Sequence, residues 1–247
     1  MPGPASPSER RQSVRSGVVW TAVQGLLADT DGEPARIVDV GGGTGGFAVP
    51  LAQLGHRVEV IDPSPDALAA LDRRAREADV ADRVTGQQGD LADLATLVDE
   101  ADLVLCHGVL DVVDDPAAAL ATIASVLRPG GHLSLLVAQR HAAVVARAMA
   151  GHFQAARDLL DDPTAGGRGS ARGGHRFTAD ELAPMLTTAG LSTVTVHGVR
   201  VFADLVPGSL LDLEPGASAA LVELESAVST RSEYLPLATQ LHVLARR

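Results

Sequence analysis

The 247-residue sequence has no lysine, one cysteine and few aromatic residues. The single cysteine, Cys106, cannot form an internal disulfide and suits a reducing compartment. No apolar run approaches the roughly 20 residues that span a bilayer. Residues 1–12 are polar and proline-rich, without the apolar core of a signal peptide. We therefore expect a soluble, cytoplasmic protein with no membrane partner.

The chain is strongly acidic, but its charged residues are unevenly distributed along the sequence. The net charge of −11 argues against general coating of nucleic acid, because most of the surface would repel phosphates. Arginines nevertheless gather between Arg140 and Arg176, where six of them accompany three aspartates. This segment is either a phosphate-contacting surface or a solvated basic region without a partner.

The most informative segment is Ile37–Phe47, IVDVGGGTGGF. A β-branched run here breaks into glycines, which predicts a buried parallel strand leading into a loop that approaches a ligand closely. Glycine allows positive φ angles and leaves no Cβ to hold the ligand away. The spacing of Gly41, Gly43 and Gly46 fits a dinucleotide fingerprint, and Asp62 closes the next predicted strand. Two adenosine-bearing ligands fit this arrangement, NAD and S-adenosylmethionine.

Strands and helices alternate regularly through the first half of the chain. Such alternation predicts an α/β fold with a doubly wound sheet, whose loops after the strands share one ligand-binding edge. The strands are expected at Arg36–Val40, Arg57–Ile61, Arg83–Gln87, Leu103–Cys106 and His132–Val137, and the helices at Thr44–Leu54, Pro65–Ala78 (capped by Ser64), Leu91–Leu97 and Pro116–Val126.

The pattern changes after the fifth strand. A long alanine-rich helix with a possible break at Gly151 precedes a Gly/Arg loop. The last two strands are joined by roughly 35 residues, which favours an antiparallel closure over another βαβ unit. The later elements are expected at Gln139–Leu160, Thr178–Ala189, Thr193–Phe202, Ala217–Val228 and Gln240–Ala245. We predict a Rossmann-like α/β fold with a seven-stranded sheet, mostly parallel with an antiparallel last strand and with helices on both faces.

One domain is expected to span residues 1–247. It would comprise a disordered tail (1–12), a leading helix over the cofactor site (13–29), a cofactor-binding βα core (35–138), an inserted helix and Gly/Arg loop (139–177), and a C-terminal βα closure (178–247).

The acids favour S-adenosylmethionine over NAD. Asp39 stands two residues before the glycines and can orient the backbone or reach the methionine end of the cofactor. Asp62 can accept ribose hydroxyls from either ligand. Gln88-Gly89-Asp90 follows the third strand, where an acid can accept the adenine amino group, a contact that dehydrogenases do not need. A Tyr-x-x-x-Lys pair, which would favour NAD, is absent because the chain has no lysine. These features together predict a class I methyltransferase fold. Each acid also has a structural alternative, since Asp39 could cap loop amides and Asp62 or Asp90 the following helix.

Further motifs are SVRSGVVW ahead of the core, CHGVLDVVDDP and LRPGGHLSLL within it, and MAGHF and GVRVFADL after it. The motifs of the core are general to methyltransferases, whereas MAGHF and GVRVFADL are specific, because neither belongs to the cofactor site. With VDVGGGTG all these motifs make the chain, from about Arg15 to His242, resemble the bacterial tRNA 5-carboxymethoxyuridine methyltransferase family, which methylates the carboxylate of a wobble uridine in tRNA. The resemblance implies cofactor contacts at Arg15, Gly41, Gly42, Asp62, Gln88 and His107. Together with Asp39, Gly43, Gly89 and Asp90, these form the predicted S-adenosylmethionine site.

The implied methyl transfer needs few catalytic side chains. A carboxylate acceptor is ionised at neutral pH and needs a cation rather than a general base. Arg200 is the candidate cation. His107, at the end of the fourth strand, is the candidate residue at the place where the methyl donor and the acceptor meet. Arg140 and His141 are weaker candidates for the substrate rim.

The sequence departs from the family in two places, at VAQRHA after the fifth strand and at Ala238-Thr239-Gln240. An O- or N-methyltransferase of a small metabolite therefore remains an alternative, as does a non-catalytic cofactor-binding protein. We predict no metal site, and the oligomeric state stays open.

Overall fold

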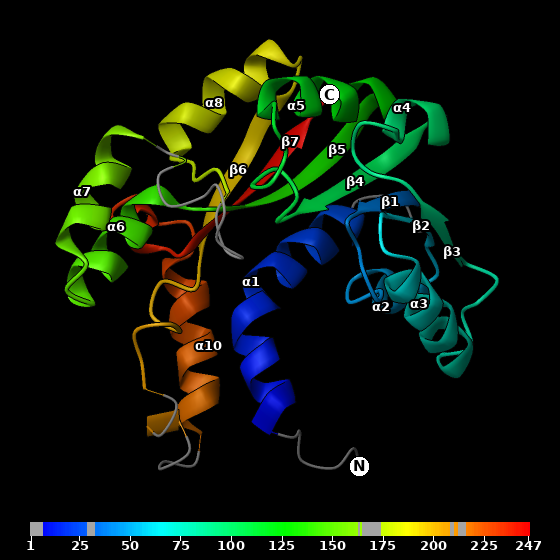
Figure 1. Ribbon diagram of the computed structural model, residues 1–247. Helices are drawn as coiled ribbons and strands as arrows, with labels where there is room; N and C mark the ends of the chain where they lie inside the picture. The colour runs from blue at the N-terminus through cyan, green and yellow to red at the C-terminus, as the bar shows by residue number, and fades with distance from the viewer. Residues whose placement is uncertain (1–6, 29–32, 163, 165–173, 208–209, 212–215) are drawn as a thin grey trace. The chain divides into compact units, whose positions relative to one another are not determined.

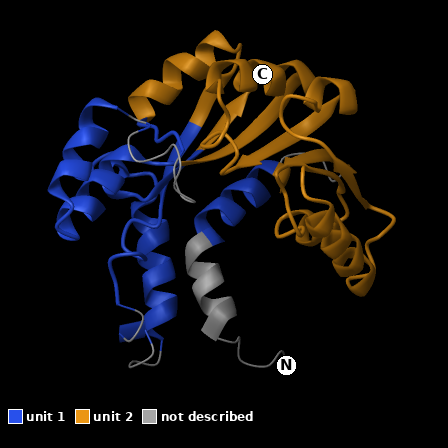
Figure 2. Ribbon diagram, in the orientation of Figure 1, with its two compact units in different colours: residues 1–26, 138–178, 195–242 blue, residues 27–137, 179–194, 243–247 orange. Residues whose placement is uncertain are grey.

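The computed structural model describes residues 7–28, 33–162, 164, 174–207, 210–211 and 216–247, with the side chains of 7–15 outside the described part. The chain forms two compact units (Figure 2). Unit 1 comprises residues 1–26, 138–178 and 195–242, and unit 2 comprises residues 27–137, 179–194 and 243–247.

Seven strands form one mixed sheet in the order β3-β2-β1-β4-β5-β7-β6. They are β1 (Arg36–Val40), β2 (Arg57–Asp62), β3 (Val84–Gln88), β4 (Ala101–His107), β5 (Leu127–Ala138), β6 (Ser192–Val199) and β7 (Gln240–Arg246). The pairs β1/β2, β1/β4, β2/β3 and β4/β5 are parallel. Because the strand order reverses beside β1, the carboxyl ends of β1 and β4 form a topological switch point, where α/β proteins bind ligands.

The last strand, β7, runs antiparallel to β5. The Gln139 N–H donates to the Thr239 carbonyl over 3.0 Å, beyond the end of β5 and before the start of β7. At the opposite ends, the Gly130 N–H donates to the Arg247 carbonyl over 2.9 Å. The predicted class I methyltransferase fold, with its antiparallel last strand, is therefore confirmed.

Five helices belong to unit 2, and they cover both faces of its strands. Figure 1 shows α2 and α3 on one side and α4, α5 and α8 on the other. They span Ala48–Gln53, Pro65–Glu77, Leu94–Leu97, Pro116–Val126 and Ala179–Thr188, respectively. Ser64 caps α3 as predicted, accepting the Ala67 N–H over 3.2 Å, and Asp115 caps α5 in the same way.

Unit 1 contains most of α1 (Pro7–Ala28) together with α6 (Arg140–Met149), α7 (Phe153–Asp161), α10 (Ala217–Val228) and the 3₁₀ turn η1 (Leu235–Leu237). The predicted break at Gly151 is confirmed, since Gly151 has a φ of 78° and separates α6 from α7. The predicted end of β6 at Phe202 is wrong. The strand stops at Val199 because the following residue, Arg200, adopts a φ of 61°.

No helix among the described residues combines the length and the apolar composition needed to cross a membrane.

Candidate cofactor site and a second cavity

The glycine loop after β1 depends on backbone conformations that side chains disfavour. Gly41, Gly43 and Gly45 have φ angles of 69°, 56° and 81°. A Cβ on Gly41 would lie 2.4 Å from Cγ2 of Val109, and one on Gly42 would lie 2.4 Å from Oδ2 of Asp39. The helix predicted from Thr44 begins only at Ala48, because left-handed Gly45 interrupts the helical path.

Asp62 ties the end of β2 to this loop. Its buried carboxylate accepts the Gly43 N–H at Oδ2 and the Ser64 N–H at Oδ1, both over 2.9 Å. An ionised carboxylate has about four acceptor positions, so two remain for a ligand such as a ribose diol. The structural alternative, that Asp62 caps α3, is not what the structure shows, because Ser64 provides that cap.

Asp39 lies buried beneath Gly42, with an exposed fraction of 3%. Burial, together with the neighbouring charge of Asp62, raises the pKa of Asp39 from 3.8 to about 7. Within the described part of the chain, no loop amide donates to Asp39. The carboxyl group is thus a buried group of raised pKa rather than a cap of the loop.

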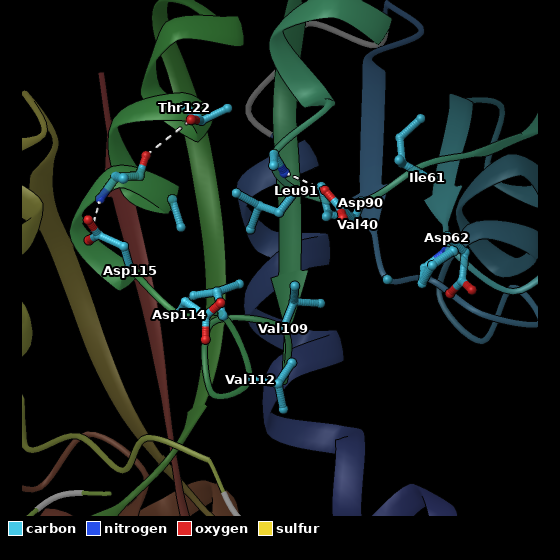
Figure 3. A pocket seen from close by; sticks show the side chains of 16 residues that line it. Val40, Ile61, Asp62, Asp90, Leu91, Val109, Val112, Asp114, Asp115 and Thr122 are labelled. Carbon is cyan, nitrogen blue, oxygen red and sulfur yellow. Dashed lines mark hydrogen bonds between the residues drawn. The ribbon is translucent and has the colours of Figure 1, made fainter. Parts of the chain in front are cut away.

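A cavity of about 620 Å³ opens beside these residues, entirely within unit 2. Figure 3 shows Ile61 and Asp62 on the β2 side and Asp114, Asp115 and Thr122 on the α5 side. Leu91 and Val109 lie between them and, with other apolar side chains, give walls that suit a flat ring. The full lining is Val40, Gly41, Ile61, Asp62, Pro63, Asp90, Leu91, Ala92, Val109, Val112, Val113, Asp114, Asp115, Ala118, Ala119 and Thr122.

Asp90, in the segment after β3, lines this cavity. One oxygen of Asp90 accepts the Ala92 N–H over 2.7 Å, so the residue shapes a turn and does not cap α4. Gln88 donates from its side chain to the Pro63 carbonyl over 3.3 Å, and the Gly89 N–H donates to the Asp62 carbonyl over 3.3 Å. Gln88 and Gly89 therefore lie next to the lining without forming it.

His107 ends β4 and lies outside the cavity lining. Its Nε2 is 2.9 Å from the Ser134 hydroxyl on β5, and its ring meets Phe47 edge-on with centroids 4.8 Å apart. Burial lowers the pKa of His107 to about 4, so the imidazole is neutral at physiological pH.

A second cavity, of about 550 Å³, lies within unit 1. The end of β5 and helix α6 form one wall, and the turn after β6 and η1 form another. Its lining comprises Ala138, Gln139, Ala142, Ala143, Val145, Ala146, Arg147, Ala150, His152, Arg176, Val201, Asp204, Leu205, Leu237 and Thr239.

The turn after β6 is held by Glu225 of α10, which the sequence analysis missed. Glu225 has an exposed fraction of 1%, and its carboxylate accepts three backbone N–H groups over 2.8–2.9 Å. The donors are Val201, Phe202 and Ala203. The predicted helix Ala217–Val228 contains two acids, Glu223 and Glu225, among mostly apolar residues, and the sequence does not distinguish which of them is buried.

Arg200 begins this turn and forms an ion pair with Asp204. Its Nη1 also lies 3.5 Å from the Gln240 side-chain oxygen, whereas its buried Nε has no partner in the described part of the chain. Asp204 additionally accepts the Thr239 hydroxyl over 2.9 Å. Asp204 and Thr239 line the second cavity, but Arg200 does not.

The remaining predicted site residues either lie away from both cavities or fall outside the described residues. Arg140 and His141 begin α6 and line neither cavity. The side chain of Arg15 and the basic residues Arg168 and Arg172 lie outside the described residues. No group of three or more His, Cys, Asp or Glu side chains in the described ranges could hold a metal ion.

A glycine loop and an acid at the end of β2, beside an apolar cavity at a switch point, match an adenosine-binding site. A methyltransferase domain model matches residues 17–196. The chain belongs to the methyltransferase domain family. This enzyme uses S-adenosylmethionine, and the NAD and non-catalytic alternatives are set aside.

Relatives of the methyltransferase act on different acceptors. The tRNA 5-carboxymethoxyuridine methyltransferase of Escherichia coli O157:H7 is 30% identical over 95% of this chain and 88% of its own length. A ubiquinone biosynthesis O-methyltransferase of Xanthomonas euvesicatoria pv. vesicatoria is 32% identical over 80% of this chain and 76% of its own.

A solved structure supports the fold of the methyltransferase. The magnesium protoporphyrin IX methyltransferase of Synechocystis PCC 6803, solved with bound SAH, superposes with a TM-score of 0.65 at 19% identity. The match covers all of this chain and 90% of the other.

Proposed function

We propose that the methyltransferase transfers a methyl group to the carboxylate of 5-carboxymethoxyuridine in tRNA. The observation that carries the proposal is the extent of the similarity, because 30% identity covers 95% of the chain, including unit 1, which lies largely outside the cofactor core. The motif GVRVFADL, which includes the turn braced by Glu225, belongs to that part. A binding cavity with cationic lining also suits an acidic acceptor.

The cofactor site is proposed to use the residues around the first cavity. Asp62 would hold the ribose hydroxyls with its two remaining acceptor positions, and Asp90 would accept the adenine amino group. Gly41–Gly43 and Gly89 would let the backbone approach the ligand, with Asp39 orienting the loop. Gln88 and His107 would complete the cofactor contacts, and Arg15 would pair with the methionine carboxylate.

The residues are proposed to act by alignment rather than by proton transfer. S-adenosylmethionine supplies a methyl group that its sulfonium already activates. A carboxylate acceptor is ionised at neutral pH, so no general base is required. His107, with its pKa near 4, would stay uncharged beside the reacting groups. Arg200 is tied to Asp204, and an acceptor would have to displace that carboxylate to reach it.

A small-metabolite acceptor is the second candidate. It is favoured by the 32% identity to the Xanthomonas ubiquinone biosynthesis O-methyltransferase and by the apolar walls of the unit 1 cavity.

The test is nucleoside mass spectrometry of total tRNA from the source organism, with and without the gene. We expect the methyl ester of 5-carboxymethoxyuridine to disappear and its free acid to accumulate. A wild-type copy should restore the ester, and an Asp62→Ala copy should not. Unchanged nucleosides, or their absence from the parent strain, would overturn the tRNA assignment and redirect the search to small acceptors.

A further inference from the structure

The cavity of unit 1 is lined by a cation, Arg147, that forms no ion pair with an acid among the described residues. We propose that Arg147, on α6, binds the carboxylate of the methyl acceptor and so sets acceptor specificity. This inference rests on the proposed function and names the residue that recognises the acidic group.

Arg147 is half-buried and lines the cavity. Its one hydrogen bond in the described structure runs from Nη1 to the Ala143 carbonyl of its own helix, over 3.4 Å. No acid in the described ranges forms an ion pair with it. A guanidinium carries five N–H donors in a planar fork that matches a carboxylate, so most of its donors are available to a ligand.

The other charged groups of the lining strengthen this assignment. Arg176 and His152 are the other basic residues, and Asp204 is the one acid in the lining. Asp204 is already engaged by Arg200 and by the Thr239 hydroxyl. With histidine neutral, the lining side chains therefore carry a formal charge of +1, from two arginines and one aspartate, although the whole chain carries −11. That contrast favours an anionic occupant over a neutral one.

The apolar part of the lining fits a ring attached to the anionic group. Val145, Leu205 and Leu237 all line the cavity, yet 43%, 54% and 44% of their surfaces remain exposed. Covering such side chains with a base is favourable because apolar surface leaves water. The volume, about 550 Å³, lies within the range of ligand pockets, roughly 300–1,000 Å³.

The cavity lining begins at the end of β5. On β5, Leu136 pairs with His107 of β4, and Ala138 and Gln139, which begin the cavity lining, follow within three residues. Buried Gln139 donates to the Leu235 carbonyl over 3.0 Å and accepts the Ala142 N–H over 3.2 Å. These bonds fix the start of α6, the helix that carries Arg147.

The experiment measures methyl transfer to tRNA that carries 5-carboxymethoxyuridine, isolated from a strain lacking this gene. The variants are Arg147→Gln and Arg147→Lys, with Arg157→Gln as the matched control. Arg157 is exposed on α7 and lines neither cavity. We expect Arg147→Gln to lower kcat/KM about 10- to 100-fold, with Lys partly restoring it, because one charge-assisted contact is lost. Binding of S-adenosylhomocysteine should not change in any variant.

A second arm separates a carboxylate contact from a phosphate contact. Calorimetry on the full chain with S-adenosylhomocysteine compares the nucleoside 5-carboxymethoxyuridine, its methyl ester and uridine 5′-monophosphate. We expect the free acid to bind more tightly than the ester, and Arg147→Gln to abolish that difference. Preference for the monophosphate over the acid nucleoside would assign Arg147 to phosphate and overturn the proposal.

The role of Arg147 and the proposed function can be tested separately. If the wild type modifies this tRNA and Arg147→Gln does so as well as Arg157→Gln, the inference is wrong and the proposed function stands. If the wild type is inactive on this tRNA, the proposed function fails and the inference fails with it.

Discussion

The two cavities of this methyltransferase are built in different ways. The cavity of unit 2 is formed by short segments that each follow a strand, and its shape depends on glycines and on acids at strand ends. The cavity of unit 1 combines residues from position 138 to position 239, and its walls are held by side chains such as Glu225 and Gln139. The first site depends on backbone geometry, the second on tertiary contacts.

This difference matters for how each site can change. In unit 2 a single Cβ would collide with Asp39 or Val109, so few substitutions leave the loop intact. In unit 1 the lining residues are mostly alanines and long side chains on α6 and on turns. A family that keeps one cofactor and varies its acceptor would be expected to conserve the first kind of site and alter the second.

The largest effect is expected at Asp62. Asp62→Ala removes a carboxylate that holds two loop amides and is proposed to hold the ribose. We expect affinity for S-adenosylhomocysteine to fall about 100- to 1,000-fold by calorimetry, since several charge-assisted hydrogen bonds are lost. Asp66→Asn, at an exposed residue of α3, is the control. Equal affinity of Asp62→Ala and wild type would remove Asp62 from the cofactor site.

Gly41→Ala tests whether the first cavity depends on backbone geometry. A positive φ and the contact with Val109 should together destabilise the fold by about 2–4 kcal/mol in urea unfolding. Gly46→Ala should be nearly neutral, because no atom lies within 4 Å of its Cβ position. In a double-mutant cycle, Val109→Ala should remove the part of this destabilisation that comes from the steric contact. The part that comes from the positive φ of residue 41 should remain. Simple additivity of the two substitutions would contradict the proposed clash.

Glu225→Gln tests the tertiary bracing of unit 1. The loss of a charged acceptor for three backbone N–H groups should cost about 2–3 kcal/mol of unfolding free energy. Binding of S-adenosylhomocysteine at 25 °C should be retained, while methyl transfer to the acceptor should fall. Glu223→Gln, exposed on the same helix, serves as the control. If Glu225→Gln keeps both the stability and the methyl transfer of the wild type, the turn does not depend on the Glu225 carboxylate.

The smallest expected effect is a pH-dependent one at Asp39. Its folded pKa of about 7 lies above its ordinary value of 3.8, so between these pH values the folded state holds a proton that the unfolded state has lost. Stability therefore falls as the pH rises through this window. Asp39→Asn should be more stable than wild type by on the order of 2 kcal/mol at pH 8, with the difference closing toward pH 4.

Thermal unfolding of wild type and Asp39→Asn across this pH range gives the measurement. The same variant should bind S-adenosylhomocysteine more weakly, because Asp39 is proposed to belong to the cofactor site. A pH-independent difference in stability between the two proteins would mean that Asp39 does not titrate in this window.

Much of unit 2 was predictable from sequence because its signals are local. The β–α alternation, the glycine loop and the acids at Asp39, Asp62 and Asp90 all lie within or just after strands, and parallel strands bring their carboxyl ends together. The cavity walls at Leu91 and Val109 were missed, although both are apolar residues just after a strand end. The shortened β6 was missed because the cause, the positive φ of Arg200 in a turn held by Glu225, involves residues 25 positions apart.

The sequence by itself determined the fold class, the order of its elements and the glycine loop after β1, since propensity, periodicity and glycine placement act over neighbouring residues. Only the tertiary structure decided which charges face a cavity. It paired Arg200 with Asp204, gave Glu225 three backbone donors and left Arg147 beside the second cavity. Such pairings depend on how distant segments pack, and residue type alone does not distinguish a paired arginine from an available one.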